Sequence, residues 1–216
     1  MKRMNGMNKI NYQKILEQTI AKQEQEGRVP TLLLHSCCAP CSSYCIEYLS
    51  QYFKITIFYF NPNITEEAEY RKRVEEQKRF IREFSTKYPV EFQEGRYEPK
   101  EFFDIAHGLE DVAEGGERCF RCYELRLREA AKIAKEQKFD YFTTTLSISP
   151  LKNAQKLNEI GKKLSEDWQC SYLYSDFKKK EGYKRSIALS AEYGLYRQDY
   201  CGCIFSKVIR EREKQG

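Results

Sequence analysis

The spacing of apolar positions changes along the chain between the period of a strand and the period of a helix. Residues 31–36 and 54–63 are short runs rich in apolar, β-branched and aromatic side chains, and both predict buried strands. Between them, residues 40–50 have the length of a helix, and Pro40 is placed to start it. The chain therefore opens with a predicted strand–helix–strand unit.

A longer amphipathic helix is predicted after the second strand. From Tyr70 to Tyr88 apolar positions recur every three or four residues, with Gln77 as the polar exception. We expect Thr65 to cap the N-terminus of this helix and the helix to end before Pro89.

The same alternation continues to residue 175. It predicts strands at 90–93, 140–147 and 170–175 and helices at about 120–137 and 153–165. This order predicts an α/β fold with an open parallel sheet flanked by helices. We expect one domain over residues 1–216, with a core at about 31–175 and a basic, aromatic, helical C-terminal part at about 176–216.

Composition narrows the class of protein. The 216 residues are 41% hydrophobic and 32% charged, and no stretch approaches the roughly 20 apolar residues of a membrane span. The N-terminal stretch has basic residues but no apolar region of the secretory type. We therefore expect a cytoplasmic protein without a membrane partner.

Nine cysteines are the main chemical feature. In a reducing compartment, an odd and clustered set favours metal binding or redox chemistry over structural disulfides. In "HSCCAPCSSYC", Cys37 and Cys38 directly follow the first predicted strand, where open parallel sheets bind their ligands. The adjoining helix N-terminus favours thiolates, which are the form that binds metals.

A second pair, Cys119 and Cys122, forms a C-x-x-C motif that suits zinc, an iron–sulfur cluster or a reactive dithiol. Together with Cys37 and Cys38 it offers four thiolates. Adjacent cysteines fit one small tetrahedral ion poorly, so we favour a [4Fe–4S] cluster, while zinc remains the alternative.

The remaining cysteines divide into two kinds. Cys201 and Cys203 flank one glycine, and such a C-x-C motif suits an easily reduced disulfide; buried thiols or further metal ligands are the alternatives. We expect Cys45 and Cys170 to be core residues.

Positive charge gathers near the C-terminus. From residue 171 onward there are ten Lys or Arg against six Asp or Glu, interleaved with tyrosines. Cations beside aromatic rings suit single-stranded or loop nucleic acid, and an ordinary solvated face is the alternative.

Four segments carry a family resemblance: "LLHSCCAPCSS", "ERCFRCYELRL", "FTTTLSISPLKN" and "DFKKKEGYKRSIALSAEYGLYRQDYCGC". Over about residues 32–205 the chain resembles the QueH-type epoxyqueuosine reductases, which reduce the epoxide of epoxyqueuosine in tRNA to queuosine. The resemblance implies a core like the adenine nucleotide α-hydrolase (HUP, Rossmann-like) folds. It also implies a cluster on Cys37, Cys38, Cys119 and Cys122, and a redox-active pair of Cys201 and Cys203.

The resemblance further implies a tRNA anticodon loop as substrate and an electron donor that the sequence does not identify. Some relatives hold an adjacent single iron partly through a carboxylate at the position that is Cys41 here. Cys41 could replace that carboxylate as a ligand. We expect the substrate contacts to be Lys178, Lys179, Lys180, Tyr183, Lys184 and Arg185, with Lys152 and Asn153. A zinc-stabilised nucleic-acid-binding protein and a thiol-disulfide oxidoreductase are the competing classes.

Overall fold

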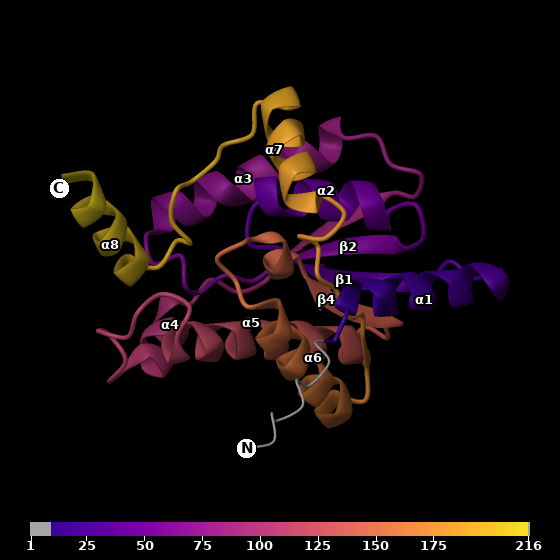
Figure 1. Cartoon of the computed structure of the whole chain (residues 1–216), viewed down its shortest axis with the longest axis horizontal. Coiled ribbons are helices and arrows are strands. Elements are labelled where there is room, and N and C mark those ends of the chain that lie inside the picture. The colour runs from indigo at the N-terminus through magenta and orange to yellow at the C-terminus, as the bar shows by residue number, and fades with distance from the viewer. Residues whose placement is uncertain (1–9, 216) are drawn as a thin grey trace, which may run out of the picture.

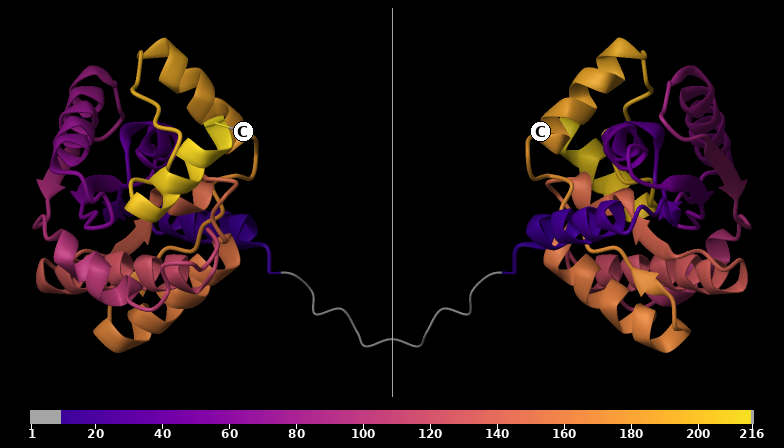
Figure 2. Two further views of the ribbon diagram at one scale, coloured as in Figure 1. Left: turned by 90° about the vertical axis from the view of Figure 1, so that its left-hand side faces the viewer. Right: turned by 90° about the vertical axis from the view of Figure 1, so that its right-hand side faces the viewer.

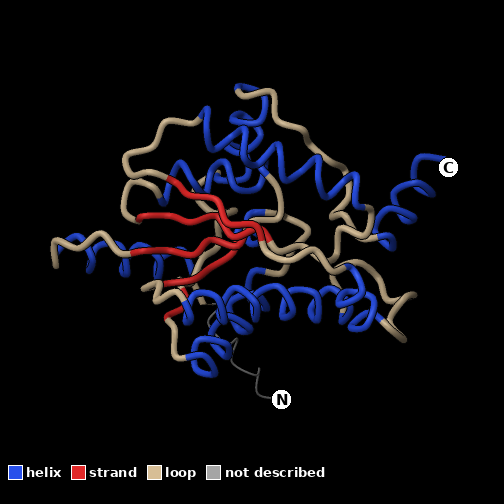
Figure 3. The backbone as a smooth tube through the Cα atoms, turned by 180° about the vertical axis from the view of Figure 1, so that it is seen from behind, coloured by secondary structure: helices blue, strands red, loops and turns tan. Residues whose placement is uncertain are grey.

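A parallel sheet forms the centre of the molecule (Figures 1 and 3). The computed structural model describes residues 10–215, so the start of the N-terminal stretch considered above, residues 1–9, lies outside the described residues. The strand order is β3-β2-β1-β4-β5 and every neighbouring pair is parallel. The strands are β1 (Thr31–His35), β2 (Lys54–Tyr59), β3 (Val90–Glu94), β4 (Tyr141–Thr144) and β5 (Ser171–Tyr172). The predicted α/β class and parallel sheet are confirmed.

Helices cover both faces of this sheet (Figure 1). One apolar core joins the sheet to α1, α2 and α3, and α7 packs on α2. The other core joins it to α5 and α6, and α4 packs on α5. The helices are α1 (Tyr12–Gln25), α2 (Ala39–Leu49), α3 (Glu67–Glu83), α4 (Pro99–Ala106), α5 (Glu117–Glu136), the 3-10 helix η1 (Thr145–Ile148), α6 (Ala154–Trp168), α7 (Gly182–Glu192) and α8 (Ile204–Gln215).

The C-terminal helix α8 connects the two helical layers. Lys207 pairs with Glu66 at the start of α3, and Phe205 packs on Phe102 of α4. In the left view of Figure 2, α8 lies across the front of the molecule between these layers. The segment that leads into α8, residues 194–203, is therefore held at the edge of the sheet.

Several predicted boundaries are wrong for local reasons. Thr65 does not cap α3, since the N-cap is Glu66 and the helix ends at Glu83. The fourth predicted strand, 140–147, stops at Thr144, because the Thr144 side chain accepts a hydrogen bond from the Leu146 N–H and starts η1. Helix α5 begins at Glu117, which places the C-x-x-C motif inside its first two turns.

Other elements were not predicted at all, namely α1 and α4. The strand expected at 170–175 is reduced to two residues. The helical character of the C-terminal part is confirmed by α7 and α8. Among residues 10–215, no helix combines the length and the apolar composition that a bilayer span needs.

Candidate metal centre

The end of β1 is anchored by His35. Its Nδ1 lies 2.9 Å from Thr144 Oγ1 and its Nε2 lies 3.0 Å from the Phe60 carbonyl oxygen. Burial lowers the pKa of His35 to about 3, so the imidazole is neutral and both of its nitrogens are engaged. His35 therefore fixes the strand end, and the thiols that follow it are the groups free for chemistry.

Three of those thiols form one group. The Sγ atoms of Cys37, Cys38 and Cys41 lie within 4.8 Å of one another, at the carboxyl end of β1 and the first turn of α2. Hydrogen bonds from the Cys38 and Cys41 thiols lower the pKa of Cys37 well below its usual value. The same interaction raises the pKa of Cys38 to about 12. A soft, partly ionised sulfur donor set of this kind suits a thiophilic metal.

The C-x-x-C motif lies on α5, which packs on the other face of the sheet from α2. Cys119 and Cys122 lie on the buried face of α5, and the Gly115 N–H donates to Cys119 Sγ at 3.2 Å. Cys37 packs against the same apolar cluster that contains Cys119. Cys119 and Cys122 are nevertheless outside the 4.8 Å group of Cys37, Cys38 and Cys41.

Two cavities are lined by these sulfurs. The larger, of about 360 Å³, is lined by Cys37, Cys38, Cys41 and Cys201, and the smaller, of about 20 Å³, by Cys119, Cys122, Cys201 and Cys203. Arg126 and Lys152 line both. Seven cysteines from three separate parts of the chain thus surround one region, while Cys45 and Cys170 are buried in the two cores as predicted.

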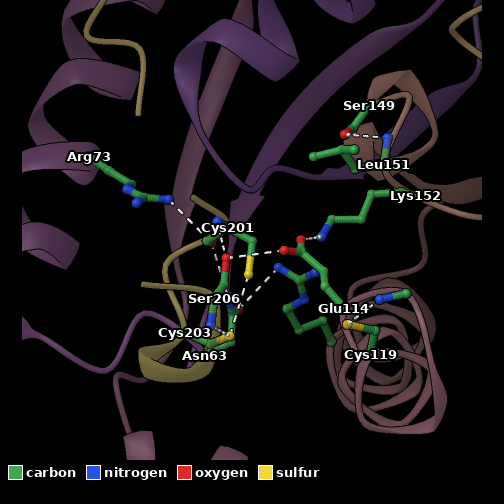
Figure 4. Close-up of polar contacts among 12 residues, drawn as sticks. Asn63, Arg73, Glu114, Cys119, Ser149, Leu151, Lys152, Cys201, Cys203 and Ser206 are labelled. Atoms are coloured by element: carbon green, nitrogen blue, oxygen red, sulfur yellow. Dashed lines mark hydrogen bonds and ion pairs between the residues drawn. The ribbon is translucent and has the colours of Figure 1, made fainter. Parts of the chain in front are cut away.

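The C-x-C segment is held by a polar network (Figure 4). Arg73 and Asn63 donate to the Cys201 carbonyl oxygen, each at 3.3 Å. The Cys201 N–H donates to Ser206, whose hydroxyl donates to Glu114, and Glu114 pairs with Lys152. The network fixes the backbone of the C-x-C motif beside the larger cavity.

The two thiols of this motif are close and unequal. Cys201 Sγ and Cys203 Sγ lie 3.5 Å apart. The hydrogen bond between the two thiols, reinforced by Lys152, lowers the pKa of Cys201 well below its usual value, and the same bond and burial raise the pKa of Cys203. One thiolate beside one thiol is the arrangement from which a disulfide forms.

Gly202 makes this closeness possible. Its φ is +110°, and a Cβ there would lie 2.7 Å from Ile64 Cγ1. We expect Gly202→Ala to lower the free energy of unfolding by about 1–3 kcal/mol, measured by urea denaturation. Gly27→Ala is the matched control, since φ is +63° but nothing lies within 4 Å. Equal losses in both variants would contradict the tight fit at Gly202.

The predicted substrate contacts differ in whether they line the larger cavity and in whether their charges are already paired. Tyr183 lines the larger cavity, and Lys152 lines it while pairing with Glu114 at 3.2 Å. Asn153 caps α6 through a bond from the Lys156 N–H. Lys179 has no ion pair within the described residues. The other cations of the segment meet carboxylates: Lys178 with Asp176, Lys180 with Glu17, Lys184 with Glu181 and Arg185 with Glu47.

Sequence reasoning missed the buried cations at this site. Arg73 and Arg126 are 2% and 3% exposed. Each interrupts the apolar face of an amphipathic helix: Arg126 lies four residues after Cys122 and four before Ala130, and all three are buried. A charged residue in an apolar stripe was the signal that could have identified them.

Fold and site together define an α/β protein with a thiol-rich centre, able to hold a metal ion, at the carboxyl edge of its parallel sheet. Comparison with known proteins is more specific. Residues 32–208 match the family model described as epoxyqueuosine reductase QueH.

Curated relatives carry the same description. Epoxyqueuosine reductase QueH of Staphylococcus epidermidis is 46% identical over 204 residues, 93% of this chain and 86% of the relative. The protein from Streptococcus pyogenes serotype M1 is 42% identical over 209 residues, 96% of this chain and 82% of the relative. The protein from Thermotoga maritima is 34% identical over 190 residues, which cover 85% of this chain and 93% of the relative. The chain therefore belongs to the QueH family of epoxyqueuosine reductases, oxidoreductases of queuosine biosynthesis.

Proposed function

We propose that this epoxyqueuosine reductase works through a [4Fe–4S] cluster held by Cys37, Cys38, Cys119 and Cys122. The observation that carries the proposal is the arrangement of cysteines from β1–α2, α5 and the C-x-C segment around two cavities that share Arg126 and Lys152. The donor set fits the group, because every candidate ligand is a soft sulfur atom and both ring nitrogens of buried His35 are engaged.

The Cys37, Cys38 and Cys41 group supports a second, single iron beside the cluster. Its three Sγ atoms converge on the larger cavity, where an open side would face the substrate. When bound, the cluster would supply single electrons and the iron would polarise the epoxide oxygen as a Lewis acid.

The reaction sets the requirements for the other residues. Removing the epoxide oxygen from tRNA-bound epoxyqueuosine needs two electrons and two protons, breaks both C–O bonds, forms a C=C bond and releases water. Oxidation of the Cys201/Cys203 pair to a disulfide releases two electrons, the number required, and one proton from the thiolate–thiol form; the second proton must come from a donor at the cavity. An external electron donor, whose identity the sequence leaves open, must then reduce the disulfide again.

Polar side chains at the cavity are available to orient the substrate. Lys152, with its charge paired to Glu114, lies beside Cys201 and can meet an oxygen of the modified base. Tyr183 offers a partly exposed ring for stacking. Asp199 and Tyr200 line the cavity and are candidate proton donors. Tyr196, a third candidate, instead donates to Glu69 at 3.2 Å.

The strand order of the sheet supports the fold type expected from the family resemblance. The strand order 3-2-1-4-5, with the site beyond the first strand, follows the Rossmann-like pattern, and we infer the adenine nucleotide α-hydrolase type. Nine free cysteines support the expected cytoplasmic compartment.

No G-x-x-x-x-G-K-[ST] segment occurs in the sequence, so we do not propose ATP use.

Anaerobic purification tests the proposed centre. A brown protein with iron and acid-labile sulfide in stoichiometric amounts, which converts epoxyqueuosine to queuosine in tRNA nucleoside analysis, is the expected result. A colourless zinc protein would select the nucleic-acid-binding module instead. A metal-free protein that exchanges disulfides would select the thiol-disulfide oxidoreductase.

The basic residues at the start of α7 and just before it allow a prediction about tRNA affinity. Reversing charge at Lys179 and Lys184 should weaken binding to all tRNAs and reduce the slope of log affinity against log salt by about 1 per lost phosphate contact. Reversal at Lys54, the first residue of β2, and at Lys87, three residues before β3, is the matched control, because both lie at the amino edge of the sheet. If both double variants bind alike in a salt titration, the basic segment is an ordinary solvated surface.

A further inference from the structure

Arg126 is a buried cation at the junction of the two sulfur-lined cavities. It lies on α5, one turn after Cys122, and is 3% exposed. It lines the larger cavity with Cys37, Cys38 and Cys41, and the smaller one with Cys119, Cys122 and Cys203. The guanidinium therefore faces thiols from all three cysteine-bearing segments.

The hydrogen bonds of Arg126 leave its charge uncompensated. Its Nη1 donates to Asn61 Oδ1 and Asn63 Oδ1, both at 3.1 Å, and both acceptors are neutral amides. Its Nε is buried without a hydrogen-bond partner. Within residues 10–215, no carboxylate lies within ion-pair distance of it.

Another buried arginine at the site does have a carboxylate partner. Arg73 pairs with Glu69 at 2.7 Å. A buried guanidinium without an anionic partner is costly, because burial removes its hydration and two neutral amides do not neutralise its charge. The neighbouring groups that can carry negative charge are the cysteine sulfurs.

We infer that Arg126 is a positioning residue whose fixed charge balances an anionic iron–thiolate centre. The inference rests on the proposed function and goes beyond it, by naming the residue that offsets the negative charge of the centre. Thiolate-ligated clusters are anionic, and their reduction potentials depend on nearby charge. Because reduction adds one more negative charge, a nearby cation stabilises the reduced form more than the oxidised form and raises the potential.

Two opposite effects of Arg126→Met distinguish this role from ordinary packing. In the iron-free protein the variant should be at least as stable to urea as the wild type, because an uncompensated charge is replaced by an apolar side chain. After anaerobic reconstitution it should lose iron to a chelator about 10–100-fold faster, as expected for loss of a group that supports metal ligands. Its reduction potential in a dithionite titration should become more negative.

Two further variants make the test specific. Arg126→Lys keeps the charge and should restore most of the potential and of the iron retention. Arg128→Met, on the same helix, removes the same charge from a side chain that is 55% exposed and paired with Glu124, and should change neither quantity.

The outcomes separate the inference from the proposed function. If wild type and Arg126→Met load iron and sulfide equally, with equal potential and retention, the inference is overturned and the cluster stands. If Arg126→Met unfolds without iron, the arginine is a structural residue and the inference is also overturned. If the wild type binds no iron, both proposals fail.

Discussion

Replacement of Cys201 or Cys203 by serine is expected to abolish turnover of epoxyqueuosine while leaving the absorbance of the iron–sulfur centre in place. The two Sγ atoms lie 3.5 Å apart and neither cysteine belongs to the proposed ligand set. Serine preserves the size of each side chain but cannot form the disulfide that releases two electrons. Nucleoside analysis of tRNA after incubation with enzyme and reductant measures the loss.

Cys170→Ser is the matched control for these variants. Cys170 is buried like Cys203, at 7% exposure, but it lies in the core formed with α5 and α6, away from the cavities. It should keep full turnover. Intact activity in both C-x-C variants would remove the dithiol from the reaction and leave it a structural element.

The second large effect is expected at the proposed ligands. Cys37→Ser and Cys122→Ser should each lose most of the iron and acid-labile sulfide, and with them all turnover, because serine is a poor ligand for iron in a cluster. The two residues come from separate segments, since Cys37 follows β1 and Cys122 lies on α5. Loss of the same chromophore in both variants would therefore place both segments on one centre.

Iron and sulfide analysis after anaerobic purification measures this effect, again with Cys170→Ser as control. Full iron content in Cys122→Ser would contradict the four-cysteine ligand set. It would then leave the Cys37, Cys38 and Cys41 group as the metal site.

Much of the fold could be predicted because the sheet is buried on both faces. Strands β1 and β2 are buried at every position after the first, and their central residues are mostly apolar, so each produced a run that was easy to identify. The rule that ligands bind beyond the first strand then located Cys37 and Cys38. Helix α1 was missed, and its buried residues include Gln13 and Gln23, which do not mark an apolar face.

The electrostatics of the site could not be predicted as well. Whether a lysine or arginine is free for tRNA depends on partners that are distant in sequence: Arg185 donates to both carboxylate oxygens of Glu47, 138 residues earlier, at 3.1 and 3.0 Å. Arg126 is the opposite case, because its amide partners Asn61 and Asn63 carry no charge. Local sequence does not contain either pairing.

Crystallographic anomalous diffraction at the iron edge, on anaerobically purified protein, tests the central claim most directly. The account predicts one iron cluster bonded to the Sγ atoms of Cys37, Cys38, Cys119 and Cys122. Iron bonded to Cys37 and Cys38 with the α5 cysteines out of bonding range, or a signal at the zinc edge alone, would contradict it.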